Sequence, residues 1–304
     1  MARVDVGDGF VSKAILTEIE SMSPTSQFPT SVHIGYFEST FGGVSKWDRL
    51  APTSEQASLW VGKRCDRPLG VLKLYPSPDG ANRERNAYRE WAAQLPQWTA
   101  SFHGSPRQDP GALVLGYVEG DSATFGASPD VFEAAGRFAA AFHGLPHDDL
   151  DSLPLREAVS RRAKASRNRG GSMTSTVHDT VERLILRGDF GRRVPSHRDF
   201  APWNWQVSQG RLTVLDFGQS RPDTWLMDLV KLVVFWTPAQ SEAFFSGYGR
   251  TLSIEEEWAL MGLVGLHGVG SLQWGQRHDQ TRPVVEGEHS LRWFEKACEH
   301  HGVG

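Results

Sequence analysis

A polar stretch at residues 197–204, HRDFAPWN, places a histidine, an aspartate and an asparagine in the pattern His-x-Asp-x-x-x-x-Asn. The apolar run RLTVLDFG follows it and places Asp216 directly before a glycine-containing turn. Runs of this kind favour short β-strands, and Gly218 allows the chain to turn sharply after Asp216. The two segments therefore predict a rigid platform on which Asp199, Asn204 and Asp216 lie close together.

These three side chains suit one kind of chemistry. The amide of Asn204 and the carboxylate of Asp216 offer oxygen atoms, the ligand type that Mg²⁺ prefers. Asp199 lies on the preceding loop, where a carboxylate can orient a hydroxyl group beside a metal site and accept its proton during phosphoryl transfer. The pattern is thus compatible with a site for phosphoryl transfer to a hydroxyl group.

A lysine lies inside an apolar strand pattern further upstream, GVLKLY, at position 73. A lone lysine in such a strand usually points to solvent. The predicted helix that follows offers Glu84, and a lysine–glutamate pair between strand and helix would hold the ammonium group of Lys73 where it can meet nucleotide phosphates. The residues alone leave both interpretations of Lys73 open.

Hydrophobic patterning divides the chain into two parts. Residues 31–75 contain the short strand-like runs SVHIGYF, ASLWVG and LGVLKLY without an intervening helical period, so we expect an antiparallel meander there. A helix is predicted in NRERNAYREWAAQL and a further strand at 112–118. Beyond Ser128, a candidate helix N-cap, the pattern is helical apart from the loops and strands of 194–218. Ser253 and Glu256 have the spacing of a capping box.

Bulk properties exclude several classes of protein. The 304 residues are enough for two packed units, and a formal net charge of −4 does not suggest a nucleic-acid binder. The two cysteines, Cys65 and Cys298, do not form a disulfide framework or a metal-type spacing. The first twenty residues lack the apolar core of a signal peptide, and the longest apolar runs are too short to span a bilayer. We expect a cytoplasmic protein that binds neither nucleic acid nor membrane.

In order and spacing these segments resemble the protein-kinase-like superfamily, and more specifically its aminoglycoside phosphotransferase and choline kinase branch. HRDFAPWN resembles the catalytic loop of that branch, LDFG its metal-binding segment, VLKLY with RERNAYREW its nucleotide-anchoring lysine and helix glutamate, and ALVLGYVEG its hinge strand beside the adenine. The resemblance covers about residues 40–235. It implies a bilobal α+β fold with a small antiparallel-sheet N-lobe containing one helix, residues 1–116, and a larger, mainly helical C-lobe, residues 117–304. Residues 1–30 would be a flexible or helical extension.

The resemblance also implies a role for each matching residue. Asp199 would be the catalytic base, and Asn204 and Asp216 would bind Mg²⁺. Lys73 would contact the phosphates of ATP or GTP, and Glu84 would pair with it. His197 and Asp228 would support the catalytic loop. The hinge would contribute Leu115, Tyr117 and Val118, and the candidate phosphate loop would contribute Gly42 and Gly43 of TFGGVSKWDRL, for which a plain hairpin turn is the alternative.

Three departures argue against a protein kinase. Ala201 stands where protein kinases have a lysine, no Ala-Pro-Glu follows Asp216, and the chain after Asp216 turns helical by about Trp225. This leaves no room for a peptide-docking platform. We therefore expect a monomeric or weakly dimeric small-molecule O-phosphotransferase that moves the γ-phosphoryl group of a magnesium nucleoside triphosphate to a substrate hydroxyl.

The acceptor is expected to be an antibiotic, either an aminoglycoside or a sugar or nucleoside type, and the enzyme would then confer resistance. The alternatives are a metabolite kinase for choline, homoserine or a sugar amine, and a catalytically inactive kinase-like binding module. The acids of SIEEEW and of EGEH, residues 286–289, could line a site for a polycation, although a helix start and a surface loop are the simpler interpretations. The basic stretch 156–171 argues against a polycationic acceptor.

Overall fold

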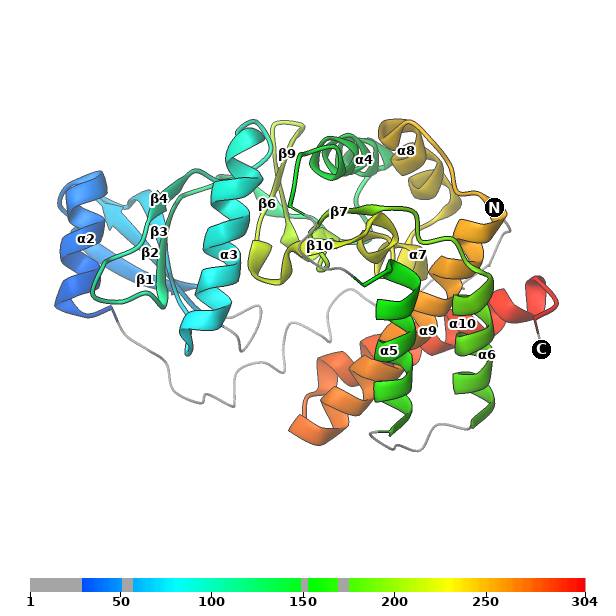
Figure 1. Cartoon of the computed structure of the whole chain (residues 1–304). Coiled ribbons are helices and arrows are strands. Elements are labelled where there is room, and N and C mark those ends of the chain that lie inside the picture. The colour runs from blue at the N-terminus through cyan, green and yellow to red at the C-terminus, as the bar shows by residue number, and fades with distance from the viewer. Residues whose placement is uncertain (1–28, 51–56, 149–152, 169–174, 304) are drawn as a thin grey trace. The chain divides into compact units, whose positions relative to one another are not determined.

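The computed structural model describes residues 29–50, 57–148, 153–168 and 175–303 (Figure 1). The chain divides into two compact units, Met1–Arg85 with Ala100–Val118, and Asn86–Thr99 with Glu119–Gly304. Residues 86–99 thus belong to the second unit, although the predicted N-lobe included them. The predicted N-terminal extension lies outside the described residues as far as residue 28.

The first unit is built on a five-stranded antiparallel sheet with the order β1-β2-β3-β5-β4. Its strands are β1 (Lys46–Leu50), β2 (Ser58–Arg64), β3 (Arg67–Leu74), β4 (Phe102–Gly104) and β5 (Ala112–Gly116). Two helices, α2 (Ser31–Phe41) and α3 (Pro78–Glu90), lie on opposite faces of this sheet (Figure 1). The N-lobe therefore has an antiparallel sheet as expected, with one helix more than the sequence predicted.

The additional helix corrects the strand that we expected at SVHIGYF. Val32 and Ile34 suggest β-structure, but the buried residues of α2 are His33 and Phe37, which are four positions apart and share one helical face. A capping box between Thr30 and His33 begins the helix, and the His33 ring Nε2 contacts the carboxylate of Asp109 at 2.7 Å. Packing of Phe37 on the sheet therefore overrides the local strand propensity.

Side chains alternate across the strands of this sheet, so its two faces carry different residues. Trp60, Leu72 and Val114 pack around Phe37 of α2. Lys73, as the neighbour of Leu72, lies on the other face, where Tyr75, Leu113 and Ala81 of α3 pack together. The alternation thus packs α2 on a face that carries a hydrophobic cluster and places Lys73 on the face that α3 covers.

The second unit combines short strands with helices. β6 (Asp121–Ser122), β8 (Trp205–Ser208) and β9 (Arg211–Val214) form a three-stranded sheet, and β7 (Arg193–Ser196) pairs with β10 (Arg221–Thr224). The helices are α4 (Pro129–His143), α5 (Leu155–Asn168), α6 (Ser175–Arg187), α7 (Leu232–Phe235), α8 (Pro238–Tyr248), α9 (Ile254–His278) and α10 (Thr281–His300). Short 3₁₀ turns are Ala92–Gln94, Pro202–Asn204, Phe217–Gln219 and Trp225–Asp228.

The predicted helix signals of this unit are confirmed. Ser128 is the N-cap of α4 with Pro129 in its first turn, and Ser253 and Glu256 form the capping box of α9. The α4–α8 contact is close because Gly136 faces the backbone carbonyl of Phe244, where an added Cβ would collide. In the described part of the chain, no helix combines the length and the apolar character needed to cross a bilayer.

Candidate active site

Two buried phenylalanines hold the polar segments in place. The loop between β7 and β8 carries Phe200, which stacks on Phe138 of α4 with ring centroids 5.6 Å apart. The turn after β9 carries Phe217, which packs on Phe142 of the same helix at 5.7 Å. Because these four rings are nearly inaccessible to solvent, the HRDF and LDFG segments are held on one rigid helix.

Asp228 binds the start of the HRDF loop from the end of a 3₁₀ turn. Its carboxylate accepts hydrogen bonds from the backbone N–H of His197 at 2.9 Å, the backbone N–H of Arg198 at 2.5 Å and the hydroxyl of Ser196 at 3.0 Å. His143 Nε2 approaches the same carboxylate at 2.9 Å. Burial opposes the charged form, but the contacts with His143 and His197 outweigh burial and lower the pKa of Asp228.

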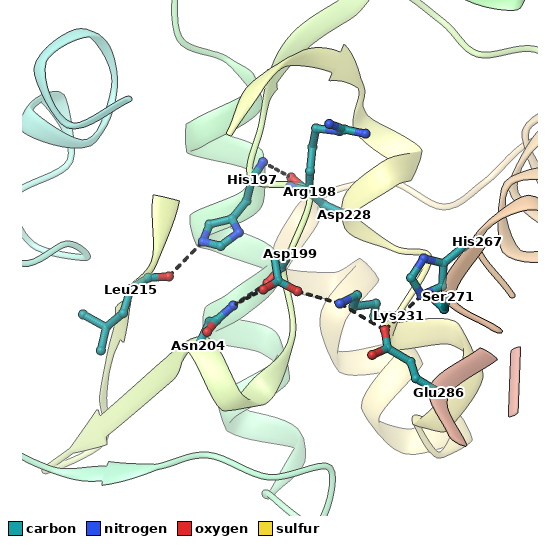
Figure 2. A network of polar contacts seen from close by, with 10 residues as sticks. All are labelled: His197, Arg198, Asp199, Asn204, Leu215, Asp228, Lys231, His267, Ser271 and Glu286. Carbon is teal, nitrogen blue, oxygen red and sulfur yellow. Dashed lines mark hydrogen bonds and ion pairs between the residues drawn. The ribbon is translucent and has the colours of Figure 1, made fainter. Parts of the chain in front are cut away.

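His197 joins the loop to the strand that leads to Asp216. Its side chain is fully buried, and Nε2 donates to the carbonyl of Leu215 at 2.9 Å (Figure 2). Its ring also packs on Phe217, with centroids 4.9 Å apart. These contacts tie the loop to Leu215 and Phe217, and the supporting role implied for His197 stays a prediction.

Arg198 faces away from Asp199 and makes a buried ion pair (Figure 2). Its Nε lies 3.1 Å from the carboxylate of Asp223, which Arg162 also contacts at 3.1 Å. Burial lowers the pKa of Arg198 to about 10. The negative charge of Asp223 acts in the opposite direction but does not outweigh burial. No role was predicted for Arg198 from the sequence, and in the structure its side chain lies in the buried support of the loop.

Asn204 contacts Asp199 with its amide nitrogen. Nδ2 donates to the Asp199 carbonyl at 2.7 Å and to the Asp199 carboxylate Oδ2 at 3.0 Å. The amide oxygen of Asn204 is therefore turned away from Asp199. The backbone N–H of Leu215 donates to the Asn204 carbonyl at 2.8 Å, which brings Asp216, the next residue, beside Asn204. The structure thus brings Asp199, Asn204 and Asp216 together.

The donor set of Asn204 and Asp216 fits a nucleotide-bound Mg²⁺. Asp216 has a left-handed backbone with φ of 62°, and its Oδ1 accepts the N–H of Gly218 at 3.3 Å. The described residues include no group of three His, Cys, Asp or Glu side chains that could hold a metal. Mg²⁺ commonly takes one or two protein oxygens and completes its shell with phosphates and water. Two oxygen ligands are sufficient for this mode.

Lys231, for which no role was predicted from the sequence, contacts the carboxylate of Asp199. Its Nζ lies 2.7 Å from Asp199 Oδ1 and 3.0 Å from Glu286 Oε1 (Figure 2). His267 Nε2 approaches the same Glu286 oxygen at 2.9 Å. Although burial disfavours its charge, the two carboxylates raise the pKa of Lys231 well above its ordinary value. The available signal was a lysine inside the apolar run LMDLVKLVVFW.

Glu286 lies inside α10, which corrects the expectation of a surface loop at EGEH. Its side chain is 13% exposed. Burial alone would raise the pKa of Glu286, but Lys231 and His267 outweigh burial and hold it far below its ordinary value. The second acidic cluster behaves differently, since Glu256 caps α9 and pairs with Arg250. Of the two clusters, EGEH is the one that reaches Asp199, through Lys231.

In the first unit, Lys73 and Glu84 form a buried ion pair. Lys73 Nζ lies 3.0 Å from Glu84 Oε2, and the Tyr75 hydroxyl donates to the same oxygen at 2.6 Å. Glu84 is fully buried and Lys73 is 5% exposed. The interpretation of Lys73 as a solvent-facing residue is therefore wrong, and the pairing of strand lysine with helix glutamate is present.

The predicted hinge residues differ in exposure. Leu115 is buried in β5, whereas Tyr117 and Val118 follow the strand and are accessible. Tyr117 lines an open pocket of about 490 Å³ together with Val61 and Lys63. Val61 and Lys63 alternate with Trp60 and Gly62, whose positions face α2. The pocket therefore opens on the Lys73 face of the sheet.

Gly42 and Gly43 lie away from Lys73. They form the turn between α2 and β1, and Arg64 donates to the Gly43 carbonyl at 2.9 Å. Across the sheet, Lys73 is opposite Leu59 and Leu59 is opposite Leu50, the last residue of β1. The glycines precede the first residue of that strand. A five-residue strand is about 16 Å long, so this register separates the glycines from Lys73 by about that distance, and the phosphate contact predicted for them stays a prediction.

Comparisons with known proteins agree with these findings. The model of the phosphotransferase enzyme family (APH) matches residues 66–263. No curated protein sequence matches the chain. Among solved structures, the chain resembles macrolide 2′-phosphotransferase MphH from Brachybacterium faecium, at 14% identity over 84% of this chain and 96% of that one, with a TM-score of 0.66.

Two other structures are similar to the same degree. The GDP and kanamycin complex of an APH(2″) phosphotransferase has 14% identity, covers 88% of this chain and 99% of that one, and has a TM-score of 0.66. Choline kinase LicA from Streptococcus pneumoniae has 18% identity, covers 85% and 96%, and has a TM-score of 0.66. At these identities the likeness establishes the kinase-like fold.

Proposed function

The chain belongs to the phosphotransferase enzyme family, and on this premise we propose that it transfers the γ-phosphoryl group of MgATP or MgGTP to a hydroxyl of a small molecule, with Asp199 as catalytic base. The observation that carries this proposal is the position of the Asp199 carboxylate. One oxygen accepts from the Asn204 amide and the other contacts the Lys231 ammonium group. The carboxylate is thus held in one orientation beside the predicted metal ligands.

The proposed step is an in-line displacement. The acceptor oxygen forms a bond to the γ-phosphorus while the bond from phosphorus to the β–γ bridging oxygen breaks, and the nucleoside diphosphate leaves with that electron pair. Asp199 orients the hydroxyl by accepting its hydrogen bond and takes its proton as the new bond forms. Because Asn204 and Lys231 already fix the carboxylate, little reorientation of Asp199 is needed during the step.

The other polar residues serve the nucleotide in this proposal. Lys73, ordered by Glu84, would contact the α- and β-phosphates. The amide oxygen of Asn204 and the carboxylate of Asp216 would hold Mg²⁺. The metal would supply positive charge that offsets the charge on the phosphate oxygens.

An antibiotic is the leading acceptor class, and a metabolite such as choline, homoserine or a sugar amine is the alternative. The similar structures include a macrolide 2′-phosphotransferase, an APH(2″) phosphotransferase in complex with GDP and kanamycin, and a choline kinase. The fold is therefore compatible with both classes. A catalytically inactive binding module is less consistent with the ordered set of Lys73, Asp199, Asn204 and Asp216, which binding alone would not require.

The test is nucleoside-diphosphate release with Mg²⁺ and ATP or GTP against a panel of aminoglycosides, macrolides, nucleoside antibiotics, choline and homoserine. Asp199→Asn should abolish acceptor-dependent release while nucleotide still binds. Asp130→Asn is the matched control, because Asp130 is exposed on α4 and makes no contact with the loop in the described structure. A wild-type protein that binds neither nucleotide would contradict the proposal.

Asp216→Ala separates the enzyme from the binding module. In the enzyme this change should eliminate turnover because it removes a metal ligand. If the protein is a binding module, Asp216→Ala should bind the small molecule as strongly as the wild type does, and neither the variant nor the wild type should show turnover. Isothermal titration and product detection on both proteins distinguish the two outcomes.

A further inference from the structure

The surroundings of Asp199 contain both features by which proteins usually hold a cationic ligand. One is a pair of carboxylates, Asp199 and Glu286, the latter on α10. The other is the indole ring of Trp203, in the 3₁₀ turn that follows Asp199. Acids attract ammonium groups by charge, and an aromatic face attracts them through its quadrupole. An aminoglycoside or choline acceptor would need at least one of them unoccupied.

The chain's own cation occupies both carboxylates. Lys231 Nζ lies 2.7 Å from Asp199 and 3.0 Å from Glu286, with its side chain 17% exposed. His267 adds a further contact to Glu286. An ammonium group of the acceptor would therefore find both acids already paired with Lys231, and like charges at such short range repel strongly.

Two cations of the chain also occupy the aromatic ring. Lys231 Nζ lies 5.1 Å from the Trp203 ring centroid, and the guanidinium carbon of Arg282 lies 4.7 Å from it. Both distances are within the range of a cation–π contact. Trp203 is therefore used internally and does not offer an aromatic cage for a quaternary ammonium group.

We infer that the acceptor carries no cationic group next to its reacting hydroxyl and presents neutral oxygens there, as a sugar-like polyhydroxyl compound does. An ammonium group has three N–H donors, of which Asp199 and Glu286 accept two. The third donates to a hydroxyl, ether or carbonyl oxygen beside the reacting group. Lys231 is thereby a specificity-determining residue. This inference rests on the proposed function and narrows its substrate class.

The test compares pairs of acceptors in which one member carries an ammonium group and the other a neutral group at the same position. Suitable pairs are glucose and glucosamine, an aminoglycoside and its fully N-acetylated form, and choline and its neutral isostere 3,3-dimethyl-1-butanol. The readouts are kcat/KM with the magnesium nucleotide and, without turnover, the thermal shift that each acceptor gives. The wild type should favour the neutral member of a pair by roughly tenfold or more.

The Lys231 variants supply the second half of the test. Lys231→Met should reduce the preference for neutral acceptors by about tenfold, because it leaves Asp199 and Glu286 open to an acceptor ammonium group. Lys231→Arg keeps the charge and should keep the sign of the preference. Lys296→Met, at an exposed position on α10, should behave like the wild type.

Two results would overturn the inference. One is a wild type that favours the ammonium member of each pair in turnover or thermal shift, and the other is a preference ratio that is the same in Lys231→Met as in the wild type. A purely structural ion pair would produce the second result, since the variant would lose stability without changing selectivity. Absence of nucleotide binding by the wild type would instead indicate failure of the proposed function itself.

Discussion

His143 and Asp228, 85 residues apart in the chain, contact each other through imidazole Nε2 and carboxylate Oδ2 at 2.9 Å inside the second unit. The other ring nitrogen of His143 meets the Tyr248 hydroxyl at 3.0 Å, so both nitrogens have partners. The same carboxylate holds the backbone at the start of the HRDF loop. The position of Asp199 therefore depends on a buried acid that does not contact the reacting groups.

Asp228→Asn should destabilise the protein and slow turnover. The replacement puts an NH₂ group where two backbone N–H groups, a hydroxyl and an imidazole now meet a carboxylate, so at least one buried donor loses its acceptor. We expect a loss of about 3 kcal/mol in the free energy of unfolding. Urea denaturation measures this loss, with Asp130→Asn as the exposed control. Equal stability of the two variants would contradict the role given to Asp228.

The stability contribution of Asp228 should depend on pH. Its folded pKa is lowered, so its contribution is fully present above the unfolded value of about 3.9 and is lost as pH falls through the lower folded value. The stability difference between wild type and Asp228→Asn should be constant from about pH 5 to 7 and shrink below about pH 4. Denaturation series at several pH values test this. A stability difference that grows on acidification would show that folding does not lower the pKa of Asp228.

The pair of Lys73 and Glu84 should act as a unit in nucleotide binding. Lys73→Met should weaken nucleotide affinity by roughly 10- to 100-fold, the value of one or more charge-assisted hydrogen bonds to phosphate. Glu84→Gln keeps a partner for Tyr75 but removes the charge that orders Lys73, so its effect should be smaller and in the same direction.

A double-mutant cycle checks this coupling, because the double variant should lose less affinity than the sum of the single losses. Lys46→Met, with its exposed lysine on β1, is the control. Additive losses in the cycle would mean that Glu84 does not act through Lys73.

Gly43→Asp should leave nucleotide affinity within about twofold of the wild type. A Cβ at Gly43 meets no atom within 4 Å, so the change should be tolerated. The β1–β2–β3 register separates this glycine from Lys73 by about a strand length of 16 Å, and at that distance salt screens an exposed charge. Titration with ATP and GTP measures the effect. A tenfold weaker affinity would restore the glycine pair as the phosphate loop.

The sequence predicted the parts of the site that lie near each other in the chain. Asp199, Asn204 and Asp216 fall within one loop and one hairpin, so local spacing and ligand chemistry were enough. The contact between Lys231 and Asp199 depends on the path through the 3₁₀ turn Trp225–Asp228 into α7, which no periodicity encodes. Lys73 was identified because it lies inside an apolar run. Lys231 also lies inside an apolar run and could have been identified by the same criterion.

Tertiary structure also accounts for what the sequence could not show in the first unit. SVHIGYF carries β-branched residues that favour a strand, but the sheet offered a hydrophobic surface that Phe37 covers from a helix. Gly42 and Gly43 were assigned to phosphate from their composition, whereas their distance from Lys73 follows from strand register. Register and packing are tertiary properties, and a single sequence reveals them only through turns and alternation.

Arg198→Met should reduce stability without changing the chemistry at Asp199. The Arg198 side chain pairs with Asp223, which is 1% exposed, and points away from Asp199. Arg162 and the Thr224 N–H still contact Asp223 in the variant. We therefore expect the free energy of unfolding to fall by about 1–3 kcal/mol, less than for a buried charge that has lost every partner. Urea denaturation measures the loss, and kcat of the folded fraction should stay within about twofold.

The double variant Arg198→Met, Asp223→Asn separates the ion pair from the loop backbone. If Arg198→Met is less stable because the charge of Asp223 is left uncompensated, the added Asp223→Asn substitution should restore part of the lost stability. If the loss arises instead from the left-handed backbone at Arg198, with φ of 63°, the second substitution should recover nothing and Arg198→Gly should be the more stable single variant. A large fall in kcat with unchanged stability would contradict both accounts and place Arg198 among the groups that act on the substrate.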